Sequence, residues 1–280
     1  TMTEIVGVGR QGCIRERRRN NVFTAETSLR SAVEAAERMA GERIKSVYAC
    51  VDARHVSSRR LGVDLDLEGG RVTHDDVADC MRASADSAAP DGYRPLALTP
   101  ITFSIDGVDV GDDPIGLAGS VLTAELLATS VLDAHCANIE ALAARCGLRI
   151  DGFQAAPAAA AQSVLLEDEM DLGCVLIDIG AGLTGYAAIE HGALILCGGV
   201  PVGGDHITRD LAQIFSAPLA HAERVKTLYG SALVGDGDEH DLVDMAQFGG
   251  AGETARVSRA EIAAVIAPRL EEIFEFVLMR

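Results

Sequence analysis

A glycine-rich segment between two apolar runs carries the residues of this sequence that are best suited to hold a phosphate group. Asp178 lies near the end of one apolar run, and Gly180 and Gly182 follow it. A hairpin whose tip is Gly-x-Gly exposes successive backbone N–H groups that bind phosphate oxygens. Glycine suits this role because the backbone must approach the ligand closely and adopt positive φ. Thr184 adds a hydroxyl donor, and Asp178 is placed to hold hydrated Mg²⁺ through water. The predicted phosphate-binding residues are Asp178, Gly180, Ala181, Gly182, Leu183 and Thr184.

A second glycine-rich segment follows, Gly203-Gly204-Asp205, which leads into a predicted helix, and its three residues are further candidates for binding the cofactor. In the next predicted helix Glu223 and Lys226 are three positions apart, so they share one side. These two residues are either a surface ion pair or polar groups for the ribose or adenine edge of a nucleotide. The corresponding alternative for the first segment is a tight glycine turn in an ordinary sheet.

The elements that must position these residues follow an α/β pattern. A strand over residues 4–8, a helix from about Thr27 to a stop at Gly41, and a strand over 44–51 are expected. The order of strand, helix and strand is typical of a parallel sheet. A similar alternation returns after Ser130, residues 173–204 read as strand-rich, and a last helix is expected to begin near Ser258.

Residues 59–128 differ from this pattern and read as a small α+β module inserted into a larger domain. Apolar and polar residues alternate over 61–68, which predicts a half-buried strand. Thr73 and Asp76 have the spacing of a capping box before a helix over 77–84. Further strands are expected over 95–105 and 121–127, joined by a loop over 106–119.

Composition excludes several functions. The net charge of −18 argues against a nucleic-acid surface, and the one basic run, 15–19, is short and is interpreted as a solvated loop. The seven cysteines include no C-x-x-C pair, which favours reduced thiols.

Residues 7–12 match G-x-G-x-x-G, but the charged residues after them do not predict the helix that a dinucleotide site needs. Four histidines share no metal-ligand spacing and are interpreted as surface or turn residues: His55, His74, His191 and His206.

Taken in order, these segments resemble the actin/Hsp70/hexokinase superfamily and, within it, the bacterial cell-division FtsA family. The resemblance covers essentially the whole chain, and residues 113–119 together with the inserted module are specific to FtsA. It implies an actin-like ATPase fold with an SHS2-like insertion. The resembling segments are 4–9, 44–48, 72–77, 113–119, 166–169, 177–182, 200–205 and 222–226. The implied subdomains are 1A (1–56 and 129–163), 1C (57–128), 2A (164–204), 2B (205–268) and the start of a returning 2A helix (269–280).

The resemblance also implies cofactors and partners. It implies ATP with Mg²⁺, weak or no ATPase activity, and docking of the FtsZ C-terminal tail on 2B. Arg259 and Arg269, read as isolated basic groups, are candidate contacts for that acidic peptide. Filament self-association and contacts with later divisome proteins are implied through 1C, and no nucleic acid is expected.

The resemblance also implies a location in the cell, the cytoplasmic face of the inner membrane. The resemblance places the membrane-binding helix and the adenosine-pocket motif beyond Arg280, and the first phosphate hairpin before Thr1. The sequence is therefore expected to behave as a fragment with weak ATP binding. The alternative function is a small-molecule kinase or phosphatase of the same superfamily, against which the insertion over 59–128 argues.

Overall fold

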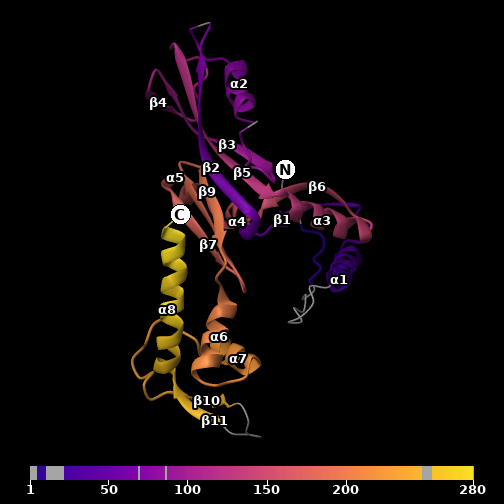
Figure 1. Cartoon of the computed structure of the whole chain (residues 1–280), viewed down its shortest axis with the longest axis vertical. Helices are drawn as coiled ribbons and strands as arrows, with labels where there is room; N and C mark the ends of the chain where they lie inside the picture. Colours follow the sequence, from indigo (N-terminus) through magenta and orange to yellow (C-terminus); the bar gives the residue numbers. More distant parts are fainter. Residues whose placement is uncertain (1–4, 11–21, 69, 86, 248–253, 280) are drawn as a thin grey trace. The chain divides into compact units, whose positions relative to one another are not determined.

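A computed structural model of the chain describes residues 5–10, 22–68, 70–85, 87–247 and 254–279. The chain divides into two compact units, Thr1–Ala159 and Ala160–Arg280. Figure 1 colours the first from indigo to magenta and the second from orange to yellow. The basic run at 15–19 lies outside the described residues.

The first unit contains the expected parallel strand pair. Strand β1 (Ser46–Val51) pairs with β6 (Arg149–Ala155) in parallel, which confirms the α/β reading of this part of the chain. Helix α1 (Val22–Ala40) ends at Gly41, whose φ of +71° favours glycine, and α3 (Asp133–Arg145) and α4 (Ala156–Val164) flank β6 in sequence.

The prediction of a strand over residues 4–8 is wrong for the described residues 5–8, which form no strand. A Cβ on Gly7 would lie 2.5 Å from Ala36 O, and one on Gly9 would lie 1.6 Å from Ala32 O. The glycines thus let this backbone pack directly against α1, where no strand offers hydrogen-bond partners. Helix α1 also begins earlier than the expected Thr27.

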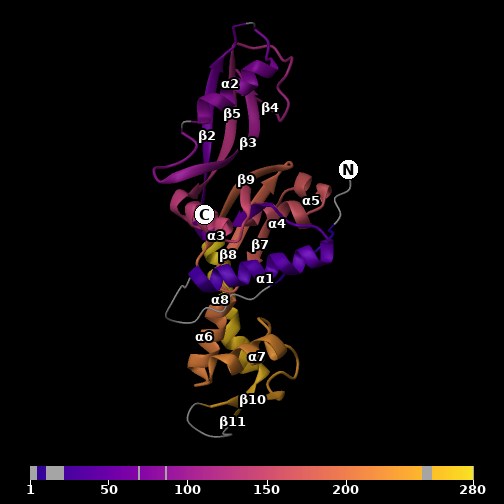
Figure 2. The same ribbon diagram turned by 90° about the vertical axis from the view of Figure 1, so that its right-hand side faces the viewer.

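A four-stranded antiparallel sheet forms the inserted module, in the order β2-β5-β3-β4. Its strands are β2 (Val56–Asp66), β3 (Tyr93–Ile105), β4 (Val108–Gly111) and β5 (Val121–Leu132), and β4 lies within the expected loop. The alternation along β2 is observed as predicted. Helix α2 (His74–Ala85) covers one face of the sheet (Figure 2), where Cys80 packs with Phe103, Leu122 and Leu126.

The capping box before α2 is confirmed. The Thr73 backbone N–H donates to Asp76 Oδ2 at 2.8 Å, and the Asp76 N–H donates to Thr73 Oγ1 at 3.2 Å. Two N–H groups at the helix start are thereby satisfied by side chains.

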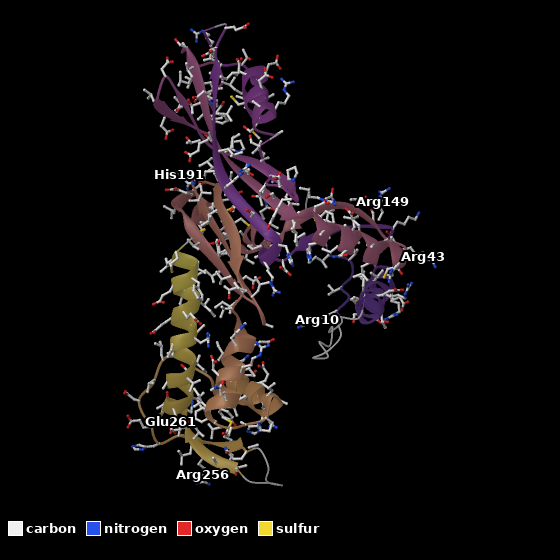
Figure 3. All side chains as sticks on the ribbon, in the orientation of Figure 1. Arg10, Arg43, Arg149, His191, Arg256 and Glu261 are labelled. Atoms are coloured by element: carbon white, nitrogen blue, oxygen red, sulfur yellow. The ribbon has the colours of Figure 1, made fainter. Side chains whose placement is uncertain are left out.

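The second unit contains a three-stranded antiparallel sheet and a helical cluster. The sheet order is β7-β8-β9, and His191, labelled in Figure 3, lies in the turn between β8 and β9 with φ of 49°. Helix α8 starts at the cap Ser258, as expected, and Leu211, Met245 and Ile262 are fully buried in the helical core. The elements are α5 (Glu167–Leu172), β7 (Cys174–Ile179), β8 (Thr184–Glu190), β9 (Ala193–Val200), α6 (Gly204–Ile214), α7 (Leu219–Tyr229), β10 (Leu242–Ala246), β11 (Thr254–Ser258) and α8 (Arg259–Leu278).

None of the helices in the described part of the chain is both long and apolar enough to cross a bilayer.

Candidate functional site

The hairpin between β7 and β8 is the centre of the candidate site. Ile179 pairs with Thr184, and the four-residue tip is closed by a hydrogen bond from Gly180 N–H to Leu183 O at 3.0 Å. Among the described residues, no hydrogen bond engages the N–H groups of Ala181, Gly182 or Leu183. These three groups are the available donors for an anion at the tip.

Gly180 acts in the tip through close packing. Neither Gly180 nor Gly182 is among the described residues with positive φ, so the prediction of a left-handed backbone at these glycines is wrong. A Cβ on Gly180 would instead lie 3.0 Å from Leu183 O, across the hydrogen bond that closes the tip. The absence of a side chain therefore lets the tip fold tightly at this position.

The tip rests on the first turn of α6. Gly204 N–H donates to Gly180 O at 2.9 Å, and Asp205 N–H donates to Ala181 O at 2.7 Å. A Cβ on Gly203 would lie 2.4 Å from Gly180 O, so this close approach requires glycine. The amides at the start of α6 are thus used to hold the hairpin, and the anion donors must come from the hairpin itself.

Asp178 and Thr184 have different surroundings, although both flank the tip. Asp178 is exposed, and no hydrogen bond or ion pair of the described residues engages its carboxylate, so it suits a hydrated cation. Thr184 is fully buried, and its hydroxyl donates to Val202 O at 2.8 Å. In this arrangement its hydroxyl joins β8 to the segment before α6 and is not directed to a phosphate, unlike the sequence-based expectation.

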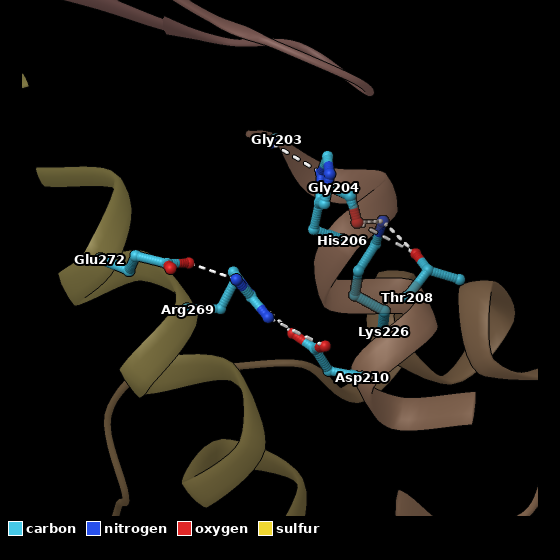
Figure 4. A network of polar contacts seen from close by, with 8 residues as sticks. All are labelled: Gly203, Gly204, His206, Thr208, Asp210, Lys226, Arg269 and Glu272. Carbon is cyan, nitrogen blue, oxygen red and sulfur yellow. Dashed lines mark hydrogen bonds and ion pairs between the residues drawn. The ribbon is translucent and has the colours of Figure 1, made fainter. Parts of the chain in front are cut away.

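Glu223 and Lys226 form part of a connected network (Figure 4 shows its lysine side). Lys226 Nζ lies 2.7 Å from Glu223 Oε2, and it donates to Gly204 O at 3.1 Å and to Thr208 Oγ1 at 2.9 Å. Partial burial acts to raise the pKa of Glu223, but hydrogen bonds from Lys226 and Thr208 hold it below its ordinary value.

This network joins α7 to the same turn of α6 that carries the hairpin tip. The pair is therefore more than a solvent-exposed ion pair, because Lys226 binds the carbonyl of a residue that itself contacts the tip. Thr208, which the sequence analysis did not single out, connects the two charges. Its position one helical turn after Gly204 is the signal that could have identified it.

Asp205, by contrast, acts mainly through its backbone. Its N–H supports the tip, and its side chain lies 3.9 Å from Arg209 as a loose, exposed ion pair. Together, the hairpin donors, the Asp178 carboxylate and the α6–α7 network can hold an anionic, Mg²⁺-bound ligand with a polar edge.

The two arginines of the predicted partner surface are paired, so reading them as isolated charges is wrong. Arg269 donates to both carboxylate oxygens of Asp210, at 2.7 and 3.1 Å, and also to Glu272 (Figure 4). The hydrogen bonds to Asp210 raise the pKa of Arg269 above its ordinary value. Arg259 lies 3.4 Å from Asp241 and 3.7 Å from Asp238.

A groove of about 470 Å³ opens beside Arg269, between α6 and α8. Ile214 and Val265 contribute apolar side chains to its lining, and charged side chains contribute to its polar character. The lining residues are Asp210, Gln213, Ile214, Ala264, Val265, Pro268, Arg269 and Glu272. On α8, Ile262 and Ile266 are buried in the core, and Val265 packs against that core and also lines this groove.

Two family models match this chain. The model described as "Cell division protein FtsA" matches residues 175–278, and the model described as "SHS2 domain inserted in FTSA" matches residues 53–129. The cell division protein FtsA of Agrobacterium fabrum is 31% identical over 278 residues, covering 98% of this chain and 63% of that protein. The FtsA of Escherichia coli K12 is 30% identical over 258 residues, covering 92% and 61%. The chain thus spans less than two thirds of the length of these relatives.

A solved structure also matches, the PilM-PilN type IV pilus biogenesis complex. Its TM-score is 0.59 at 16% sequence identity, with 95% of this chain and 65% of that chain covered. At this identity the likeness shows the fold alone. With the two family models, it confirms the expected fold class, an actin-like α/β fold with a small inserted α+β module.

Proposed function

The chain belongs to the family of cell division protein FtsA, and from this premise we propose that it is an ATP-binding, actin-like cell-division protein that polymerises and links FtsZ to the membrane. The observation that carries the ATP proposal is the β7–β8 tip, where three N–H groups have no hydrogen-bond partner among the residues that the structure describes. The tip contacts the turn of α6 that Lys226 also binds. The first turn of α6 thus positions both the N–H donors of the hairpin tip and the polar side chain of Lys226.

The residues of the site take distinct parts in the proposal. The N–H groups of Ala181, Gly182 and Leu183 bind phosphate oxygens, and Asp178 holds hydrated Mg²⁺ through water. Glu223 and Lys226 face the ribose or adenine edge. Mg²⁺ would supply charge neutralisation of the phosphates, and no residue of this site is assigned to hydrolysis.

The test compares Asp178→Asn with wild type, in the protein at its natural length. Binding of ATP is measured by calorimetry with Mg²⁺ and with EDTA. Because a charged group of this kind contributes about 1.5–3 kcal/mol, we expect a roughly 10- to 100-fold loss of affinity in Mg²⁺ only. Asp178 is exposed and unpaired among the described residues, so the unfolding midpoint should not change.

Asp112→Asn is the matched control, because Asp112 is also exposed and belongs to the inserted module of the other compact unit. It removes the same charge and should leave ATP affinity unchanged. Equal Mg²⁺-dependent affinities of wild type and Asp178→Asn would remove Asp178 from the site.

For the partner, we propose that the FtsZ C-terminal tail binds the groove between α6 and α8. The groove combines the exposed apolar side chain of Ile214 with the Arg269 guanidinium, which suits a peptide that is both apolar and acidic. Because Asp210 already pairs with Arg269, an acidic group of the tail must share or replace that partner.

The binding test measures fluorescence anisotropy of an FtsZ tail peptide at two salt concentrations. Arg269→Glu should nearly abolish binding, and wild-type binding should weaken as salt rises. Arg256→Glu is the control, since Arg256 is exposed on β11 with only a loose contact to Asp244. Thermal unfolding of each variant separates lost folding from lost contact. An affinity that is unchanged by Arg269→Glu would exclude this groove.

Filament formation and contacts with later division proteins are proposed through the inserted module, residues 57–128, and residence on the cytoplasmic face of the inner membrane is proposed with them. These assignments rest on family membership. Sedimentation and electron microscopy with and without ATP test the filament. ATP-dependent pelleting is expected; release of phosphate from ATP in the presence of sugars or acyl acids, with no filaments, would favour the kinase or phosphatase alternative instead.

A further inference from the structure

A cluster of potential metal ligands lies in the first compact unit, next to the strands through which the chain enters and leaves the inserted module. Asp52, His55 and His135 each offer one ligand atom, and these atoms all lie within 4.8 Å of one another. All three residues are partly buried. The imidazole rings of His55 and His135 are stacked, with centroids 3.9 Å apart and planes at 25°. We propose that these three residues bind a divalent cation of the Zn²⁺ class.

The fold explains why residues so far apart in sequence meet. His55 ends a short 3₁₀ helix, η1 (Ala53–His55), directly before β2, and His135 lies in the first turn of α3, directly after β5. Strand β2 pairs with β5 through Val56 and Val131, so the residues flanking this pair are brought together. His55 directly precedes Val56, and His135 is the third residue of α3, which begins directly after β5.

The acidic ligand is held by its own secondary structure. Asp52 is the N-cap of η1, and its Oδ1 accepts a hydrogen bond from Arg54 N–H at 3.1 Å. The carboxylate is therefore oriented before any cation binds, and a metal needs only one of its oxygens.

The donor set selects the class of cation. Two imidazole nitrogens and one carboxylate oxygen suit Zn²⁺, Co²⁺ or Ni²⁺, whereas Mg²⁺ and Ca²⁺ prefer oxygen ligands throughout. Among the described residues, no hydrogen bond engages a ring nitrogen of His55 or His135.

A small movement of the side chains would bring the three ligand atoms to the distances that Zn²⁺ requires. Tetrahedral ligands about 2.0–2.1 Å from Zn²⁺ lie about 3.3 Å from each other. The ligand atoms, at most 4.8 Å apart, must therefore approach by no more than about 1.5 Å. A fourth position remains for water. A cation held there would tie the segment entering the inserted module to the segment leaving it.

The experiment titrates Zn²⁺ into the full chain after removal of metals by a chelator. Heteronuclear NMR of the imidazole nitrogens reports each histidine separately, so binding to cysteine thiols is distinguished. We expect saturable shifts of the His55 and His135 nitrogens at one equivalent, with His74 unchanged. Shifts at neither ring, or equal shifts at all histidines, would overturn the proposal.

Variants then measure the affinity by calorimetry. Asp52→Asn keeps a side-chain oxygen that caps η1, so the fold is retained while the anionic ligand is lost. We expect at least a tenfold loss of Zn²⁺ affinity in Asp52→Asn and at least a hundredfold loss in His135→Ala. The control His74→Gln removes an exposed histidine of the same unit and should not change affinity. Unchanged affinity in Asp52→Asn and His135→Ala would also overturn the proposal.

Discussion

Because the hairpin tip packs closely against α6, we expect the single methyl group added in Gly203→Ala to lower the free energy of unfolding. The added Cβ would lie 2.4 Å from Gly180 O, 2.9 Å from Leu183 N and 3.0 Å from Ala181 O. All three are backbone atoms, so no side chain can rotate away. An ordinary carbon–oxygen contact is about 3.5 Å, and the tip must therefore move from α6 by about 1 Å.

This movement breaks the two hydrogen bonds that seat the tip. Gly204 N–Gly180 O and Asp205 N–Ala181 O, now 2.9 and 2.7 Å, would lengthen beyond the hydrogen-bonding range. Each contributes about 0.5–1.5 kcal/mol, which gives a loss of about 1–3 kcal/mol, similar to the usual cost of overpacking. With a urea m-value of about 2 kcal/mol/M, the unfolding midpoint should fall by about 1 M.

The assay is urea unfolding followed by circular dichroism, with ATP affinity measured in parallel. Gly204→Ala is the neighbouring control, because its Cβ would lie 3.4 Å from the flexible end of Lys226 and 3.8 Å from Gly180 O. It should be neutral or slightly stabilising, as alanine is favoured over glycine in helices. If Gly203→Ala were as stable as Gly204→Ala, the hairpin would not rest on α6 as described.

Two further predictions concern single hydroxyl groups. Ser258→Ala should lower the free energy of unfolding by about 1 kcal/mol in urea titrations, since Ser258 caps α8. Hydrogen bonds from the backbone and hydroxyl of Ser258 hold the pKa of Glu261 below its ordinary value, so this stabilisation is full at neutral pH and is lost as pH falls below about 4.3. The gap between wild type and Ser258→Ala should therefore narrow in acid, and a constant gap would contradict this coupling. Thr184→Val should lower the free energy of unfolding by about 1 kcal/mol, because it leaves Val202 O without its hydrogen bond. It should change ATP affinity less than twofold. A tenfold loss of ATP affinity would instead indicate that the Thr184 hydroxyl donates to a phosphate.

Much of the fold follows from local patterns in the sequence. The alternation along β2, the capping box of Thr73 and Asp76, and the start of α8 at Ser258 are all observed as predicted. Strand β4 and the region of residues 5–8 were not predicted correctly. β4 is a short strand that depends on pairing with β3, and residues 5–8 have a strand-like composition but pack on α1.

The sequence by itself determined the hairpin, because a glycine-rich tip between two apolar runs is encoded within a few neighbouring positions. Only the tertiary structure decided what each side chain of that region does. Thr184 faces Val202, and Lys226 binds Gly204 O, because β8, α6 and α7 pack together. Arg269 is neutralised by Asp210 from another helix. Contacts between distant residues depend on strand register and helix packing, and these follow from the burial of the whole core rather than from spacing along the chain.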